Sequence, residues 1–235
     1  MAAERAPDPA APPSQLDRLL APEIRRDRLS RAVEAVGATP GVRHILDIGA
    51  SSGEGSTAAW VRGALRNPLR PTIYCLEVSV PRFAELARRW QNHDFVKCYN
   101  VSSVPAERFP TEEEVARFYR EVRSKLRNVR LEKVLGWLRQ DLAYLAEHAL
   151  SGDGIGRIKT ENGISGFDAV LIDGSEFAGK PELDAVWGAR FILLDDTRSY
   201  KNWENYRRLK ADPSHRLVTR SYWSRNGFAV FERRA

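Results

Sequence analysis

The stretch from residue 45 to residue 56 constrains the fold of this chain more than any other. It reads Ile-Leu-Asp-Ile-Gly-Ala-Ser-Ser-Gly-Glu-Gly-Ser, so a short apolar run around Asp47 is followed by three glycines. The run is typical of a buried parallel strand, and the glycines allow a tight turn in which a ligand approaches the backbone. A helix is predicted next, over the alanine- and leucine-rich stretch 58–66. Strand, turn and helix together predict a nucleotide-type pocket, with an ordinary strand-to-helix turn as the alternative.

The size of the chain fits one α/β domain. It has 235 residues, of which 43% are hydrophobic, so a substantial core can be buried. No apolar run approaches the roughly 20 residues that span a bilayer, and the N-terminus lacks an apolar signal core. Residues 1–22 hold five prolines and six alanines. We therefore expect a flexible N-terminal segment over 1–22, a domain over 23–235 and no membrane partner.

Charge and cysteine content bound the partners and the compartment. The net charge is +6, but the arginines are spread along the chain and mixed with acids, which favours a solvated surface over a nucleic-acid partner. The two cysteines, Cys75 and Cys98, lie in apolar runs. This predicts buried free thiols rather than a disulfide, and hence a cytoplasmic location.

Strand-like and helix-like segments alternate along the chain. Alternation of this kind predicts a mostly parallel sheet with helices on both faces. Asn226-Gly227 lies between two β-rich runs, which predicts a final hairpin. The expected strands are 43–48, 72–77, 94–99, 168–173, 190–195, 215–222 and 227–233, and the expected helices are 24–37, 55–66, 81–90, 181–187 and 199–210.

The glycine spacing separates two kinds of nucleotide-type pocket. Dinucleotide sites usually read G-x-G-x-x-G, whereas this chain reads D-x-G-x-x-x-G-x-G from Asp47 to Gly55. In this pattern the segment resembles the class I S-adenosylmethionine (SAM) methyltransferases. The resemblance covers roughly residues 40–235. It implies an α/β, Rossmann-like, seven-stranded and mostly parallel sheet with an antiparallel last strand.

Residues 102–150 exceed an ordinary crossover between the third and fourth strands. Thr111 and Glu114 form a predicted capping box. Apolar residues then recur at helical spacing from Val115 to Leu126 and again from Leu131 to Leu145. We expect a helical insertion over 102–150 that acts as a lid or as the interface of a homodimer, with an added helical layer of no special role as the alternative.

The cofactor pocket can be assigned residue by residue. The glycine turn offers backbone N–H groups to the amino-acid end of SAM, and Asp47 either organises this turn or binds the ammonium group. Glu77 ends the second strand, where both its chemistry and the resemblance favour the ribose diol. The resemblance also places the adenine site just after the third strand. The predicted cofactor-binding residues are Asp47, Gly49, Ser51, Ser52, Gly53, Glu77, Asn100 and Val101.

Acidic residues follow the fourth and fifth strands. Asp173 ends the fourth, and Asp195-Asp196 end the fifth. Adjacent parallel strands bring these ends to one edge, where three carboxylates would repel unless a hard cation such as Mg²⁺ lay between them. Their positions resemble those of the metal-dependent O-methyltransferases, of the catechol O-methyltransferase and macrocin O-methyltransferase types. The resemblance implies Asp173, Asp195 and Asp196 as Mg²⁺ ligands, and a helix cap at Asp195-Asp196 is the alternative.

These predictions combine into a reaction. A hydroxyl oxygen of a small molecule, such as a sugar or natural product, would attack the SAM methyl while a base takes its proton. Asp173 and Glu176 are the candidate bases, with Lys180 as a third. The alternatives are a metal-independent methyltransferase acting on nitrogen, carbon or a macromolecule, a non-catalytic module that keeps the fold, and a nicotinamide oxidoreductase, which the glycine spacing disfavours.

Overall fold

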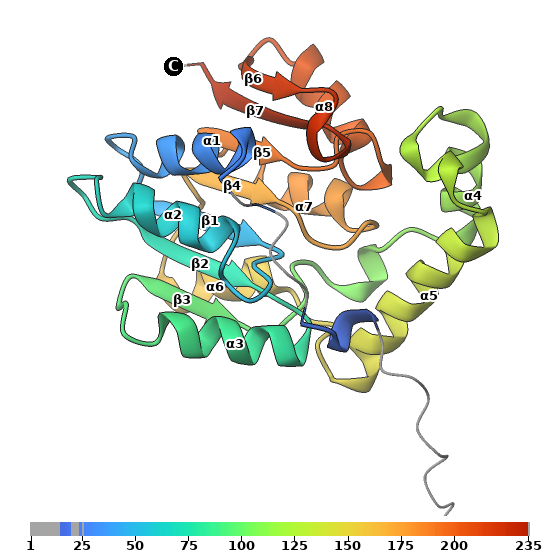
Figure 1. The fold of residues 1–235 in the computed structure, drawn as a ribbon, viewed down its shortest axis with the longest axis horizontal. Helices are drawn as coiled ribbons and strands as arrows, with labels where there is room; N and C mark the ends of the chain where they lie inside the picture. Colours follow the sequence, from blue (N-terminus) through green and yellow to red (C-terminus); the bar gives the residue numbers. More distant parts are fainter. Residues whose placement is uncertain (1–14, 20–23, 25, 235) are drawn as a thin grey trace, which may run out of the picture.

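A computed structural model describes residues 15–19, 24 and 26–234. They form a seven-stranded sheet in the order β3-β2-β1-β4-β5-β7-β6 (Figure 1). Strands β1 to β5 are parallel, and β7 runs antiparallel to both β5 and β6. The predicted fold class is confirmed. The strands are β1 His44–Ile48, β2 Thr72–Leu76, β3 Val96–Tyr99, β4 Ala169–Ile172, β5 Phe191–Leu194, β6 His215–Ser221 and β7 Phe228–Arg233.

The central strands are buried on both faces. Every residue of β4 and β5 is buried, and four of the five residues of β1 are buried. Helices α1 (Arg28–Gly37), α2 (Ser56–Ala64) and α3 (Val80–Trp90) contribute to one core. Helices α6 (Gly154–Asn162), α7 (Gly179–Val186) and α8 (Tyr200–Ala211) cover the opposite face. Burial on both faces explains why these strands are continuous apolar runs rather than alternating ones.

Two helical expectations need correction. The helix expected over 24–37 begins only at Arg28, because the Asp27 side chain accepts the Ser30 N–H at 2.7 Å and caps the helix there. The chain also forms α6, which was not predicted. Glycines at positions 154 and 156 weaken the helical pattern of this segment, and tertiary packing of Ile155 and Ile158 overrides them.

The insertion over 102–150 contains two helices, α4 (Glu112–Glu121) and α5 (Leu131–Glu147). The capping box of Thr111 and Glu114 is present. The first helix is shorter than its apolar spacing suggested, since Val122 is extended and Leu126 lies in a separate 3₁₀ turn. Figure 1 shows α4 and α5 standing to one side of the sheet. Their core includes Phe177 from the loop after β4, so the insertion packs directly against the edge where the candidate site lies.

Part of the N-terminal segment expected to be flexible is packed in the structure. Gln15–Asp17 form a 3₁₀ turn, η1. Arg82 Nε donates to the carbonyl oxygen of Arg18 at 2.9 Å, and Tyr144 donates to Asp17 at 3.0 Å. The rest of the segment, residues 1–14 and 20–22, lies outside the described residues.

Two simpler expectations can also be compared with the structure. Cys75 is a buried free thiol, as predicted, whereas Cys98 is a free thiol that is only partly buried. They lie opposite each other on β2 and β3. Among the described residues, no helix is both long enough and apolar enough to cross a membrane.

Candidate active site

The strand register brings the predicted site residues to one edge of the sheet. Ile48 pairs with Leu76 and with Ile172, and Ile172 pairs with Leu194. The residues that follow these strand ends therefore emerge side by side, at the carboxyl edge where α/β proteins bind ligands. A cleft of about 400 Å³ opens there. Its lining includes the glycine turn and Glu77 as well as Asp173, Glu176 and Asp196.

The glycine turn touches the neighbouring strand end. Gly49 has φ +82°, and a Cβ atom there would collide with the carbonyl oxygen of Asp173. Only glycine allows both this conformation and this approach. The N–H groups of Gly49 and Ala50 both donate to the carbonyl oxygen of Leu76 at 3.0 Å. The turn is thereby fixed between the β2 end and the carboxylate cluster. The expectation that its N–H groups are offered to SAM is wrong for Gly49, Ser51 and Gly53, because these groups donate to Leu76, Glu77 and Ala50 within the protein.

Glu77 is held firmly at the cleft. Its carboxylate accepts the Ser51 N–H at 2.7 Å and the Ser79 N–H at 2.8 Å, and only 5% of the residue is exposed. Burial raises the pKa of Glu77, and the two backbone donors partly offset that rise. A carboxylate so placed retains lone pairs for two further donors, such as the hydroxyls of a ribose diol.

Asp47 is fully buried and faces the turn. Its Oδ2 accepts the Ser56 hydroxyl at 3.0 Å and the Thr57 hydroxyl at 2.6 Å. Burial raises the pKa of Asp47 to about 6. Of the two roles predicted for Asp47, these contacts favour organisation of the turn.

The other predicted cofactor residues divide between the cleft wall and the layer behind it. The carbonyl oxygens of Ser52 and Gly53 accept from Arg89 and Trp90 of α3. The Asn100 amide donates to the backbone of Glu77 at 2.7 Å. Of the eight predicted residues, Gly49, Ser51, Glu77 and Val101 line the cleft, whereas Asp47, Ser52, Gly53 and Asn100 support it from behind.

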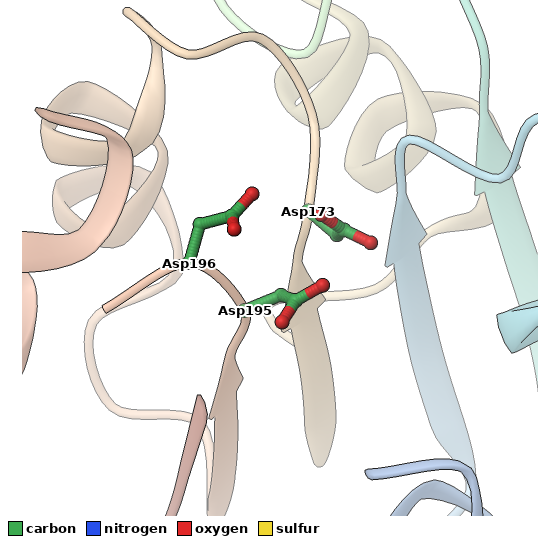
Figure 2. A group of neighbouring side chains, drawn as sticks. All are labelled: Asp173, Asp195 and Asp196. Carbon is green, nitrogen blue, oxygen red and sulfur yellow. The ribbon is translucent and has the colours of Figure 1, made fainter. Parts of the chain in front are cut away.

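The three predicted metal ligands converge. Asp173, Asp195 and Asp196 place carboxylate oxygens within 4.8 Å of one another (Figure 2). Asp196 has φ 52°, a conformation that costs free energy and persists where surrounding contacts enforce it. One such contact is the buried Asn202 amide, which donates to the carbonyl oxygens of Ile172 at 3.0 Å and Asp195 at 2.6 Å. Asn202 therefore ties the ends of β4 and β5 together.

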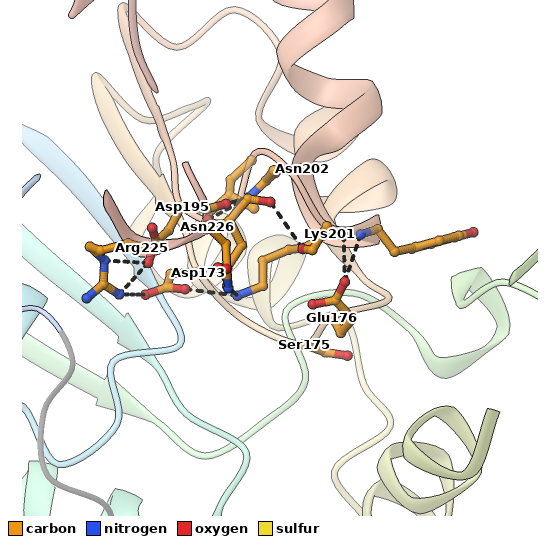
Figure 3. Close-up of polar contacts among 12 residues, drawn as sticks. Asp173, Ser175, Glu176, Asp195, Lys201, Asn202, Arg225 and Asn226 are labelled. Carbon is orange, nitrogen blue, oxygen red and sulfur yellow. Dashed lines mark hydrogen bonds and ion pairs between the residues drawn. The ribbon is translucent and has the colours of Figure 1, made fainter. Parts of the chain in front are cut away.

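Two cations of the chain itself reach these carboxylates (Figure 3). Lys201 Nζ lies 2.9 Å from Asp173 Oδ1 and 3.1 Å from Asp196 Oδ2. Arg225 donates to Asp195 Oδ2 through Nε at 3.0 Å and also through Nη2. Burial by itself would lower the pKa of Lys201, but the surrounding carboxylates raise it well above its ordinary value.

Sequence reasoning missed both of these cations. The sequence places Lys201 in the polar stretch 198–206, which is typical of a sugar or polyol site or of an ordinary surface helix. Arg225 lies in the tight turn of the last hairpin, which the Asn-Gly pair revealed only as a turn. No local pattern indicates that either side chain points at an acid on another element.

The fit of a divalent ion can be judged from these contacts. Three carboxylates are the oxygen donors that Mg²⁺ prefers. However, an ammonium already bridges Asp173 and Asp196, and a guanidinium holds Asp195. Asp195 Oδ1 is buried without a hydrogen-bond partner, but a divalent ion bound by all three carboxylates would compete with Lys201 for Asp173 and Asp196. The residues as arranged therefore do not fit the metal, and Mg²⁺ binding stays a prediction.

Glu176 caps α8 from the loop after β4. Its Oε1 accepts the N–H groups of Tyr200 at 2.7 Å and Lys201 at 3.4 Å. Burial raises the pKa of Glu176 to about 7. By contrast, Lys180 is largely exposed and pairs with Glu204 at 3.4 Å. Of the candidate bases, Glu176 combines a place in the cleft with a pKa near neutrality.

The insertion supplies a wall of the cleft near these carboxylates. Trp137 and Asp141 of α5 line it, together with Phe109 and Phe177. The Ser175 hydroxyl donates to Asp141 at 2.6 Å, which links the loop after β4 to α5. Sequence reasoning placed a helix here but did not single out Trp137 or Asp141.

Solved structures with a similar fold include O-methyltransferases. An O-methyltransferase from Bacillus cereus in complex with SAH (S-adenosylhomocysteine) superposes with a TM-score of 0.52 at 14% identity, over 92% of this chain and 84% of that one. A putative caffeoyl-CoA O-methyltransferase from Staphylococcus aureus gives a TM-score of 0.51 at 11% identity, over 88% and 84%. This chain has the fold of the class I SAM-dependent methyltransferases. No family model and no curated protein matches the sequence.

Proposed function

We propose that this protein is a SAM-dependent methyltransferase that transfers the methyl group to a hydroxyl of a small molecule. The observation that carries this proposal is the single cleft at the carboxyl edge of the sheet. The glycine turn, Glu77, Asp173 and Glu176 all line this cleft. The chain shares its fold with an O-methyltransferase whose structure contains SAH, and this likeness supports the proposal that SAM is the cofactor.

The part of the cleft at the glycine turn suits the parts of SAM that do not react. The ribose diol offers two donors to the buried Glu77 carboxylate. The Gly49 and Ser51 N–H groups already donate to Leu76 and Glu77, so the backbone there would meet the amino-acid end through carbonyl oxygens that accept from its ammonium group. Val101 adds an apolar surface for the adenine. Because Glu77 and its partners are ordered by backbone hydrogen bonds, little side-chain freedom is lost on binding.

Another part of the cleft wall suits a hydroxylated acceptor of modest size. Aromatic side chains at Phe109, Trp137 and Phe177 lie near polar groups at Gln140 and Asp141. This mixture can stack on a ring while it hydrogen-bonds to hydroxyls, as a sugar or a natural product requires. We propose that α5, and hence the insertion, acts as the wall that closes over this acceptor.

Glu176 is the proposed general base. It would accept the proton of the acceptor hydroxyl as the oxygen lone pair forms a bond to the SAM methyl carbon. The carbon–sulfur bond breaks with its electron pair moving to sulfur, which yields neutral SAH. Asp173, the other candidate, is less available because its Oδ1 accepts from Lys201 at 2.9 Å.

Calorimetry with SAH and with NAD, in parallel, tests the cofactor. We expect SAH to bind and NAD not to bind. Glu77→Gln should weaken SAH binding about 10- to 100-fold, because it removes a charged acceptor of two hydrogen bonds. The matched control is Glu85→Gln, since Glu85 pairs with Arg88 on α3 outside the cleft. Equal SAH affinity in the two variants would argue against this pocket.

Release of SAH in the presence of hydroxylated, amine and protein acceptors then tests the reaction. Turnover with sugars or phenols supports the proposal. Turnover only with amines or macromolecules would favour the alternative class of methyltransferase, and SAH binding without any turnover would favour a non-catalytic module.

A further inference from the structure

The cluster of Asp173, Asp195 and Asp196 already contains a cation, which is the side-chain ammonium of Lys201. The Lys201 ammonium lies 2.9 Å from Asp173 (Figure 3) and 3.1 Å from Asp196. An ammonium has three N–H donors. Two are directed at these carboxylates, and Lys201 lines the cleft, so the third can meet an oxygen of a bound molecule.

Most of the remaining carboxylate oxygens have partners of their own, whereas Asp195 Oδ1 is buried without a hydrogen-bond partner. Asp196 Oδ1 accepts the Asn226 amide at 3.1 Å. Asp195 Oδ2 accepts from Arg225, whose Nη2 also lies 4.0 Å from Asp173 Oδ2. Three carboxyl groups therefore share two cations within the cluster, and Arg225 Nη1 also lies 3.7 Å from Asp27 Oδ2. The two cations reduce the repulsion between like charges that would otherwise call for a divalent ion.

The fold positions Lys201 for this place. Lys201 is in the first turn of α8, and its side chain is 7% exposed. A Cβ atom on Gly179 would collide with the carbonyl oxygen of Lys201, so a glycine in α7 lets the start of α8 approach this closely. The Glu176 carboxylate caps the same turn. An exposed, mobile lysine would have none of these constraints.

We propose that Lys201 takes the place of a divalent metal in this site, holding the acceptor oxygen through its third N–H, a role that rests on the methyl-transfer function proposed above. Asp173 and Asp196 then position the ammonium instead of binding a metal. As Glu176 removes the proton, the fixed positive charge stabilises the negative charge that develops on the acceptor oxygen. Catalysis therefore needs no added divalent ion.

Binding of Mn²⁺, followed by electron paramagnetic resonance of the full-length protein, tests this role without any acceptor. In the wild type we expect no saturable Mn²⁺ site at millimolar ion. Lys201→Met should gain one equivalent of bound Mn²⁺, because it leaves three carboxylates against one guanidinium. Mg²⁺ should raise the melting temperature of Lys201→Met but not that of the wild type. Lys180→Met is the matched control, since Lys180 is exposed on α7 and should behave as the wild type does.

Activity gives a second readout. Treatment of the wild type with EDTA should leave kcat/KM unchanged, and Lys201→Met should lower kcat about 10²- to 10³-fold in metal-free buffer. Tight binding of one equivalent of Mn²⁺ to the wild-type protein would overturn the proposal, and so would loss of wild-type activity in EDTA. So would a folded Lys201→Met protein that gains no Mn²⁺ site.

The Mn²⁺ titration of the wild type decides the matter even if Lys201→Met fails to fold. It also separates this proposal from the function on which it rests. A protein that binds neither SAH nor any acceptor would refute the methyltransferase function, whereas the Mn²⁺ result reports on Lys201 alone.

Discussion

At Glu176, burial raises the pKa to about 7, while the nearby Lys201 charge acts in the opposite direction. A general base works in its deprotonated form, so kcat/KM should rise with pH and level off above about 7. Glu176→Gln should lower kcat about 10²- to 10⁴-fold and remove this rise. A glutamine oxygen can still accept the Tyr200 N–H, so the helix cap and SAH affinity should be kept. Steady-state kinetics across the neutral range would check this, and wild-type kcat in the variant would exclude Glu176 as the base.

Single residues also show where sequence reasoning ends. Asp173 and Asp195 could be placed together because each ends an apolar strand and parallel strands end at one edge. Lys201 and Arg225 could not, since their partners are set by how α8 and the hairpin turn pack, which no local spacing encodes. The sequence therefore predicted the anions of the site but not the cations that balance them.

At the scale of elements, α5 is the part of the insertion that reaches the cleft. Trp137→Ala should raise KM for the acceptor about tenfold, as expected for the loss of one aromatic contact, and leave the SAH affinity unchanged. Trp187→Ala is the control, because Trp187 is 44% exposed and lies outside the cleft wall. Acceptor kinetics combined with SAH calorimetry would separate the two effects. A parallel loss of SAH affinity would instead place Trp137 at the cofactor.

Helices and strands were predicted well where their local residue pattern is distinctive and poorly where it is weak. The seven strands were found within two residues of their expected bounds, because buried apolar runs bounded by turn residues are distinctive. Helix α6 was missed because two glycines interrupt it and only its packing against the sheet makes it helical. The capping box of α4 was predicted correctly. The length of that helix was predicted wrongly, because the last apolar residue of the pattern, Leu126, lies in a separate 3₁₀ turn.

At the scale of the whole molecule, buried carboxylic acids link the stability of the fold to pH. Glu182 of α7 is fully buried, its Oε1 accepts the Ser103 hydroxyl at 2.5 Å, and its Oε2 is buried without a hydrogen-bond partner in the structure. Burial raises the pKa of Glu182 to about 7. Asp47 and Asp141, with pKa values raised to about 6, act in the same direction.

A raised pKa means that the folded state binds the proton more tightly than the unfolded chain does. Protonated Glu182 therefore stabilises the fold fully below about pH 4.5. This stabilisation is lost as the pH rises to about 7, and the free energy of unfolding falls by about 3 kcal/mol. Glu182→Gln cannot ionise, so its stability should fall less steeply over this range than that of the wild type. Urea unfolding at a series of pH values would measure the difference, with Glu121→Gln on the exposed surface of α4 as the control. Parallel curves for the wild type and Glu182→Gln would show that Glu182 ionises in the folded protein at its ordinary pKa.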